Sequence, residues 1–409
     1  MKGAAIKERL NEMYSVSPFY FIVSAGMLFF SFVFLICCFL TAGHVFNNFL
    51  WFKHGEYFRD FFDSVFYASD DPYTKWHVIY PGVAMIFYTI LAYFLCNNVD
   101  ISGIPDDLAP YVLRDSQYGL MLYMVVVLLS LILIKIALPK ELKQKQCFEI
   151  FFTIVIVLSA PVLLAIERGN NILLVVAFCL IFLKWYNSEN IYLCYIAIAS
   201  LAIATAFKLY PAIFAFLLLK ERQYAYFVKT VLILALTVVL STALLGGGPV
   251  DLVLSILTFS YSSSGTRSAI YSLSDLTKYL GIDSYSLIIT GIVVMITLIV
   301  TVLDREMYIW MALCLLSAVL SICNGIGTPY LACNMIIPMV YFITYENDKT
   351  TLNMIYCVLF IGVFAIIPVL DMQYCYPIVN TIPFVCIVLL WASIVSKSAS
   401  KLMHQARDY

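Results

Sequence analysis

Charged side chains are scarce in this sequence. Asp, Glu, Lys and Arg together make up 12% of its 409 residues, whereas 63% of the residues are hydrophobic. A soluble domain has no core large enough to bury so much apolar surface, so the composition excludes a soluble globular protein and indicates a polytopic membrane protein. The formal net charge is −1, and the chain has no long basic run, which argues against a nucleic-acid partner.

Signatures of metal binding and of export are also missing. The 12 cysteines lie mostly inside apolar runs and form no CxxC pair of the kind that indicates zinc or redox chemistry. We interpret them as small apolar fillers. The first apolar run, Phe19 to Thr41, is long enough to span a bilayer, which takes about 20 residues, and it lacks the small-residue cleavage pattern of a signal peptide. It is therefore predicted to be the first membrane span.

Apolar runs alternate with short polar loops along the rest of the chain. This pattern predicts an all-α polytopic membrane protein, a single integral membrane domain over residues 1–409 with about 12 transmembrane helices. The apolar run 80–97 is short and follows a proline, so we expect a short or re-entrant helix there. A second short helix, 211–219, is expected to return from Lys208 to the cytoplasm as half of a broken pair. The other expected spans lie near residues 118–138, 148–166, 171–186, 191–207, 227–245, 285–303, 308–322, 329–343, 352–370 and 376–395.

Lysine and arginine residues predict the orientation of these spans. The N-terminal tail carries three of them, and the positive-inside rule places such a tail in the cytoplasm. The same assignment puts the later basic loops inside, both termini in the cytoplasm, and residues 42–80 and 246–284 outside as two long external loops. The basic residues used here are Lys2, Lys7, Arg9, Lys140, Lys143, Lys145, Lys220, Arg222, Lys229, Lys397, Lys401 and Arg407.

Acidic residues are concentrated in the first external loop. If residues 51–68 are helical, apolar side chains recur at three- and four-residue spacing, and Glu56, Asp60 and Asp63 share the opposite face. Such a helix is expected to lie in the membrane interface, with its aromatic side in lipid or protein. The carboxylates would then point into a cavity above the membrane, or they would simply face water.

Other polar clusters fall on the same predicted side of the membrane, where they indicate a site. Glu167 and Arg168 are either an ion pair at a helix end or part of that site. Lys208 stands in an apolar stretch three residues before Pro211, where it either snorkels to the interface or binds an anion beside a broken helix. The loop 246–284 is either a flexible connector or a lid that brings Arg267 to a substrate.

Short motifs in this order resemble the DUF2029 (GT87-like) group of membrane glycosyltransferases of the GT-C fold. This group uses polyprenyl-phosphate sugars and includes mycobacterial mannosyltransferases. The matching residues are Asp60-Phe61 with Tyr67-Ala68, Asp71-Pro72-Tyr73, Tyr80-Pro81, Glu167-Arg168-Gly169-Asn170, Lys208-Leu209-Tyr210-Pro211, and Ser272 to Leu276 with Leu280-Gly281. Two positions depart from the pattern. Gly82 stands where the group has a second proline, and the region around Tyr330 and Asn334 lacks its usual histidine, so one of these two side chains takes that place.

The resemblance implies a chemistry that these residue types can perform. Asp60 would be the general base that accepts the proton of an acceptor hydroxyl, with inversion at the anomeric carbon, and Asp63 is the alternative base. Lys208 and Arg168 would bind the donor phosphate, whose negative charge grows as the bond breaks. The remaining candidates are expected to bind substrate, namely Glu167, Asn170, Tyr80, Arg267 and Tyr330.

These expectations define a function and its alternatives. The predicted enzyme moves a sugar from a polyprenyl-phosphate donor to a glycan or glycolipid acceptor, on the periplasmic or exterior face of the inner (plasma) membrane. The alternatives are an O-antigen-type polysaccharide polymerase, expected to have arginine-rich external loops, and a transporter or flippase of lipid-linked glycans, expected to have internal repeats. No cofactor is predicted. The only metal-like acidic pair, Asp70-Asp71, has proline and tyrosine neighbours that suit a turn better, and dependence on a divalent cation stays open.

Overall fold

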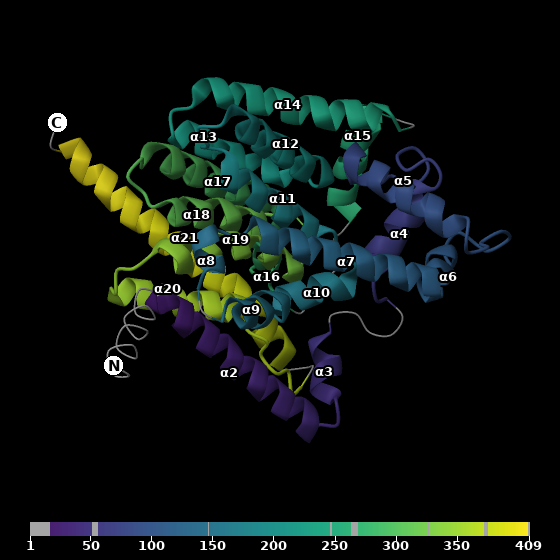
Figure 1. Ribbon diagram of the computed structural model, residues 1–409, viewed down its shortest axis with the longest axis horizontal. Helices are drawn as coiled ribbons and strands as arrows, with labels where there is room; N and C mark the ends of the chain where they lie inside the picture. Colours follow the sequence, from purple (N-terminus) through teal and green to yellow (C-terminus); the bar gives the residue numbers. More distant parts are fainter. Residues whose placement is uncertain are drawn as a thin grey trace, which may run out of the picture. The chain divides into compact units, whose positions relative to one another are not determined.

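A computed structural model of the chain describes residues 17–50, 56–145, 147–245, 248–262, 269–325, 327–371 and 375–407. Every regular element within these ranges is helical (Figure 1), which confirms the prediction of an all-α protein. The chain divides into two compact units. One, the central unit, comprises Leu50–Ala137 and Leu164–Thr266, and the other, the terminal unit, comprises Met1–Phe49, Leu138–Leu163 and Arg267–Tyr409.

The central unit is organised around helix α11. This helix is apolar on all sides and mostly buried, as expected of a helix with neighbours all round. It packs against α7 and α12, and α12 packs in turn against α14. The helices of this unit are α4 (Arg59–Ala68), α5 (Gly82–Cys96), α6 (Ala109–Asp115), α7 (Gln117–Ala137), the end of α10 (Ala160–Arg168), α11 (Ile172–Trp185), α12 (Ile191–Phe207), η2 (Tyr210–Ala215), α13 (Phe216–Lys220), α14 (Tyr224–Ala243) and α15 (Gly248–Ser262).

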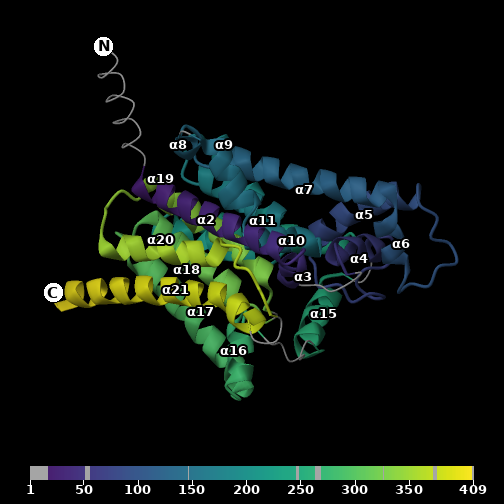
Figure 2. The same cartoon turned by 90° about the horizontal axis from the view of Figure 1, so that it is seen from below.

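The terminal unit has a comparable central helix, α18, which is buried along its whole length. It packs against α17, α19 and α21, and α20 packs against α21 and α2 (Figure 2). The helices of this unit are α2 (Pro18–Leu40), α3 (His44–Phe49), α8 (Lys140–Lys143), α9 (Phe148–Phe151), η1 (Phe152–Val157), α16 (Leu273–Tyr279), η3 (Asp283–Tyr285), α17 (Ser286–Leu303), α18 (Ile309–Ile322), η4 (Pro329–Met335), α19 (Ile336–Tyr345), α20 (Thr351–Phe364) and α21 (Cys375–Arg407).

Five of the described helices are long and apolar enough to cross a membrane, or six if one bent pair forms a single span. The chain is therefore an integral membrane protein, as predicted. The count of about 12 spans is not confirmed, because the other apolar helices have only 10–17 residues and a straight span takes about 20. The long candidates are Pro18–Leu40, Gln117–Ala137, Tyr224–Ala243, Asp283–Leu303 and Cys375–Gln405, and the bent pair is Phe148–Val157 with Ala160–Arg168.

Three predicted segments differ in detail from the structure. The helix expected over 51–68 begins only at Arg59, because Phe58 has left-handed backbone geometry (φ 61°), so Glu56 precedes the helix. Residues 51–55 of that prediction lie outside the described part of the chain. The predicted loop 246–284 contains the helices α15 and α16 rather than being a plain connector. The helix predicted at 211–219 is confirmed as a separate piece after a break at Lys208, but it starts with 3-10 geometry.

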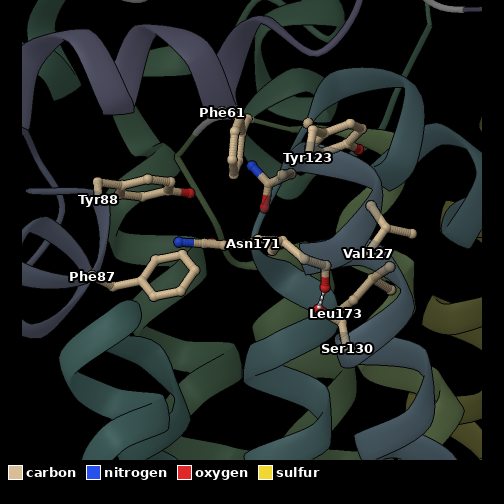
Figure 3. Close-up of a pocket in the computed structure, with 11 residues that line it drawn as sticks. Phe61, Phe87, Tyr88, Tyr123, Val127, Ser130, Asn171 and Leu173 are labelled. Carbon is tan, nitrogen blue, oxygen red and sulfur yellow. Dashed lines mark hydrogen bonds between the residues drawn. The ribbon is translucent and has the colours of Figure 1, made fainter. Parts of the chain in front are cut away.

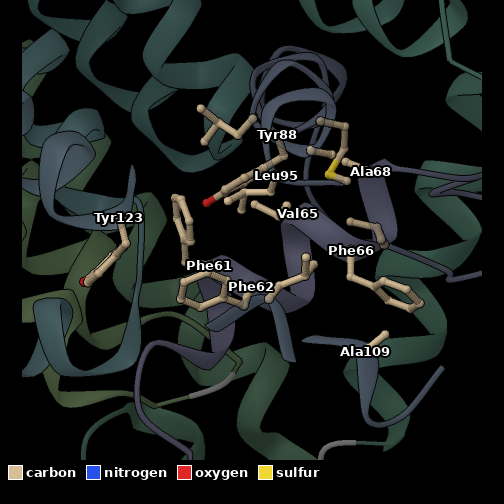
Figure 4. Packing of buried hydrophobic residues seen from close by; sticks show 14 of the residues in the cluster. Phe61, Phe62, Val65, Phe66, Ala68, Tyr88, Leu95, Ala109 and Tyr123 are labelled. Atoms are coloured by element: carbon tan, nitrogen blue, oxygen red, sulfur yellow. The ribbon is translucent and has the colours of Figure 1, made fainter. Parts of the chain in front are cut away.

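Aromatic side chains fix the position of α4 within the central unit. Phe61, Phe62 and Val65 are almost completely buried in a cluster with residues of α5, α6 and α7, among them Tyr88 and Tyr123 (Figure 4). The apolar side of α4 therefore faces protein, one of the two predicted surroundings. Since residues three and four apart share a face of a helix, burial of this side leaves the acids of α4 on the other.

Candidate active site

A tight turn between α10 and α11 lies directly against the start of α4. The backbone N–H of Phe58 donates a hydrogen bond to the carbonyl of Glu167 at 2.7 Å. Gly169 has φ +75°, and a Cβ atom on it would lie 2.6–2.8 Å from backbone atoms of Phe58. Glycine is required here for its left-handed geometry and for the close approach. This approach brings the residues on either side of Gly169 to the first turn of α4.

Those two residues bind the carboxylate of Asp60. Nε of Arg168 lies 2.7 Å from Oδ1 of Asp60, and Nδ2 of Asn170 donates to Oδ2 at 2.8 Å. Only 15% of the Asp60 side chain and 18% of the Arg168 side chain are exposed. Hydrogen bonds and ion pairs that involve ionised groups are the strong ones. Asp60 is thus oriented by two donors, one on each oxygen.

Lys208 reaches the same cluster from the end of α12. The helix stops at Phe207, and Lys208 takes up extended backbone geometry ahead of the proline at 211, because Pro211 has no N–H for the carbonyl of Phe207 four residues earlier and its ring would clash with that carbonyl in a continuous helix. Its ammonium group donates to Oδ1 of Asn170 at 2.9 Å and lies 5.6 Å from the centre of the Tyr80 ring. Cations are attracted to aromatic faces at such distances. The broken helix therefore places a cation one amide group away from Asp60.

Asp63, the alternative base, has different partners one turn along α4. Its Oδ2 atom accepts from Nε of Arg59 at 3.0 Å, and Arg59 also binds Glu56 at 2.7 Å. Burial raises the pKa of the Asp63 carboxyl, and the Arg59 charge opposes that effect. Arg59 was not among the predicted site residues, although its i, i+4 spacing to Asp63 was a signal for this pair. Asp63 sits in a local ion pair, whereas Asp60 is bound by groups from a distant part of the chain.

A family match assigns this geometry to a class of enzyme. Residues 79–325, well over half of the chain, match the model of glycosyltransferase family 87. The chain belongs to glycosyltransferase family 87. This confirms the resemblance drawn from the short motifs. No curated protein and no solved structure matches the chain. The matched range of the glycosyltransferase includes Tyr80, Arg168, Asn170 and Lys208. Asp60 precedes this range and contacts it through Arg168 and Asn170.

The other three predicted substrate-binding residues of this glycosyltransferase are Glu167, Tyr330 and Arg267. Glu167 is buried, with 6% of its surface exposed, and its backbone carbonyl anchors Phe58. Tyr330 is buried in η4 of the terminal unit. Arg267 lies outside the described residues. The structure thus groups Asp60 with Arg168, Asn170, Lys208 and Tyr80, and leaves the substrate contacts of the remaining three as predictions.

The acidic pair at 70–71 forms a turn in the glycosyltransferase, as its neighbours indicated. Oδ1 of Asp71 accepts from the backbone N–H groups of Tyr73 and Thr74 at 3.2 and 3.0 Å, and its Oδ2 accepts from the Thr74 hydroxyl. Asp70 pairs with Lys75 at 2.8 Å. Among the residues that the structure describes, no cluster of three or more His, Cys, Asp or Glu side chains could hold a metal ion. Metal dependence stays a prediction.

A small cavity lies behind the acid in the glycosyltransferase. Its lining combines aromatic rings of α4, α5 and α7 with the amides that follow Gly169, and the Asn171 amide and the Tyr88 ring both border it (Figure 3). It has room for about one water molecule, which is far too little for a sugar. Neither residue was predicted. This cavity therefore supports the cluster from behind and does not hold the substrate.

Proposed function

We propose that this glycosyltransferase moves a sugar from a polyprenyl-phosphate donor to a hydroxyl group of a glycan or glycolipid acceptor, with inversion at the anomeric carbon. The observation that carries the proposal is the cluster of Asp60, Arg168, Asn170 and Lys208. It combines a partly buried carboxylate with two cations in a family that transfers sugars.

The chemistry needs a base on one side of the sugar and a cation on the other. The acceptor oxygen forms a bond to the anomeric carbon while the bond from that carbon to the phosphate oxygen breaks, and the electron pair leaves with the lipid phosphate. The transition state carries positive charge on the sugar and growing negative charge on the phosphate. The base takes the proton of the acceptor hydroxyl, and the cation stabilises the leaving phosphate.

Asp60 is suited to be the base. One of its carboxylate oxygens is paired with Arg168 and the other accepts a hydrogen bond from Asn170, and an ionised carboxylate has about four acceptor sites in all. Positions therefore remain for an acceptor hydroxyl. Asp63 keeps its place as the alternative base, but its local pairing with Arg59 argues for a structural role.

Lys208 is suited to be the phosphate ligand. An ammonium group beside a broken helix can bind a phosphate oxygen as a point charge. Arg168 was also predicted to bind the phosphate. Its close contact with Asp60 supports instead a main role in orienting the base. Mannose is the sugar that the resemblance suggests. The polyprenyl tail of the donor dissolves in the bilayer, which agrees with a protein that spans it.

The sidedness of the reaction is part of the proposal. The lysine-rich segments fall on one side of the predicted topology and the acid-bearing loop on the other. The site would then face the periplasm or exterior of an inner (plasma) membrane, where envelope glycans are built. Membership of a glycosyltransferase family favours sugar transfer over the transporter alternative.

The experiment uses the full-length protein in lipid nanodiscs with a panel of polyprenyl-phosphate sugars and hydroxyl acceptors. Wild type is expected to consume one donor. Asp60→Asn is expected to lose roughly 10²–10⁴-fold in rate and Lys208→Met roughly 10²–10³-fold. Lys75→Met is the matched control for Lys208, since Lys75 is an exposed surface partner of Asp70, and it should leave the rate unchanged.

Two results would contradict the proposal. If no polyprenyl-phosphate donor is consumed by folded wild type, the donor class is wrong. If Asp60→Asn turns over normally while Asp63→Asn is inactive, the base is Asp63 and the assignment of Asp60 is wrong. Retention of fold is checked for each variant by its melting temperature and its elution on size exclusion.

A further inference from the structure

We propose that Asn170 is a positioning residue that keeps the Asp60 carboxylate and the Lys208 ammonium apart while binding both of them. Its amide stands between the two groups, donating to Asp60 at 2.8 Å and accepting from Lys208 at 2.9 Å. The inference rests on the proposed function, because it assigns Asn170 a part in holding the base and the phosphate ligand rather than in touching substrate.

The orientation of this amide is fixed by a third contact. Oδ1 of Asn170 also accepts from the backbone N–H of Ile172 at 3.1 Å. If the amide were reversed, its NH₂ group would face two donors and its oxygen would face the carboxylate, so every contact would be repulsive. Only 7% of Asn170 is exposed, so water cannot compensate for those losses. The side chain therefore has one stable orientation.

The Asp60 carboxylate and the Lys208 ammonium must stay apart because the proposed function gives them different roles. A lysine bound directly to Asp60 would have its charge engaged by the carboxylate and would bind a phosphate more weakly. The carboxylate already pairs with Arg168, and direct contact with a second cation would make it a poorer base. The intervening amide holds both groups in place by hydrogen bonds and prevents this direct ion pair.

Only position 170 changes in the variants proposed below. Several other titratable or charged groups surround Asp60. They lie on α4, α5 and α7, at the end of α10, and in the segment before α4. They stay the same in every variant, so a difference between variants reports on position 170 alone. These groups are Arg168, Asp63, Tyr88, Tyr123 and, through Arg168, Glu56.

The test compares two substitutions that should act in opposite directions. In Asn170→Ala the ammonium of Lys208 can reach Asp60, so the acid limb of the kcat/KM profile should move to lower pH by about one unit. The KM for the lipid-phosphate donor should rise about tenfold, which is about 1.4 kcal/mol of lost binding. In Asn170→Asp a second carboxylate faces Asp60, so the acid limb should move to higher pH by about one unit.

The measurement uses full-length protein in nanodiscs, with the polyprenyl-phosphate sugar that wild type consumes. Asn98→Ala is the control, because Asn98 is an exposed residue of the central unit whose side-chain amide donates to the carbonyl of Phe94, and its profile should match wild type. A merely structural role for Asn170 would leave the acid limb of Asn170→Ala unmoved or moved to higher pH, because the variant loses the amide donor to Asp60. If the alanine variant does not fold, Asn170→Ser, which also shortens the side chain, takes its place.

The outcomes separate this inference from the proposed function. Active wild type with acid limbs that move in opposite directions supports the spacer role. Active wild type with both limbs unchanged, or moved in the same direction, overturns the spacer role and leaves the proposed function standing. A folded wild type that consumes no donor overturns the proposed function and the spacer role with it.

Discussion

Nε of Arg168 lies 2.7 Å from Oδ1 of Asp60, so a cation at the end of α10 pairs with the predicted base at the start of α4. Neither residue's local sequence indicates this contact. For Arg168, which was predicted to bind the donor phosphate, the contact favours our proposal that it orients the base. It also brings the end of α10 and the start of α4 into one cluster.

Gly169 should be more sensitive to substitution than Gly103. Gly169 and Gly103 have nearly the same left-handed φ, +75° and +74°, but a Cβ atom at Gly103 would meet nothing within 4 Å. Alanine at either position should incur the left-handed backbone cost of about 1–2 kcal/mol. Only Gly169→Ala should add a clash with the backbone of Phe58. The melting temperature in nanodiscs and the rate of sugar transfer are the measurements.

Gly103→Ala is the matched control for that comparison, because it isolates the backbone term. We expect it to keep its activity and to melt slightly earlier than wild type. Equal losses of stability in the two variants would show that the contact between Gly169 and Phe58 is unimportant.

The predicted orientation of the protein in the membrane can be tested by labelling two exposed positions. Cys147 is exposed and follows the lysine-rich segment assigned to the cytoplasm, and Ser102 is exposed in a segment assigned to the outside. A membrane-impermeant maleimide on intact cells should label Ser102→Cys but not Cys147. After permeabilisation both should react. The Cys147→Ser background removes the native signal, and labelling of Cys147 in intact cells would reverse the proposed orientation.

The turn at Asp71 should open in acid. Donors from Thr74 lower the pKa of the Asp71 carboxyl. A lowered pKa means that the ionised group stabilises the fold, an effect present above the ordinary value of about 3.9 and lost as the pH falls through the lower folded value. Amide hydrogen exchange at Tyr73 and Thr74, corrected for its intrinsic pH dependence, should therefore show protection at pH 6 that is lost only after the pH has fallen below the ordinary value of about 3.9.

Asp71→Asn provides the comparison for that experiment. The neutral amide cannot titrate, so protection in the variant should be weaker at pH 6 and should not change with pH. Protection in wild type that stays constant down to about pH 1 would show that the carboxylate does not hold the turn.

Sequence patterns predicted the helices well where the signal is local. The span expected at 118–138 is the helix Gln117–Ala137, because a long apolar run with polar ends fixes a helix directly. The number of spans could not be predicted in the same way. Helices such as α11 and α18 are apolar because protein surrounds them, and composition alone does not distinguish a buried helix from one in lipid.

The candidate site was predicted in its members but not in its connections. Asp60, Asn170 and Lys208 were each singled out by charge or polarity in an apolar context. That Asn170 bridges the other two depends on contacts between residues far apart in the chain, which periodicity does not encode. Asn171, which borders the cavity behind Asp60, was missed because an amide next to another amide in a turn carries no signal of its own.

The hydrogen bond from Phe58 to Glu167 has a consequence for the energy of reaction. The start of α4 is hydrogen-bonded to the end of α10, which bears Arg168. Asp60 and Arg168 therefore already face each other before any substrate arrives. Charges that are oriented in advance need no rearrangement as the bond to phosphate breaks, so that cost is absent from the activation barrier. The free energy needed to orient these charges is supplied once, when the chain folds.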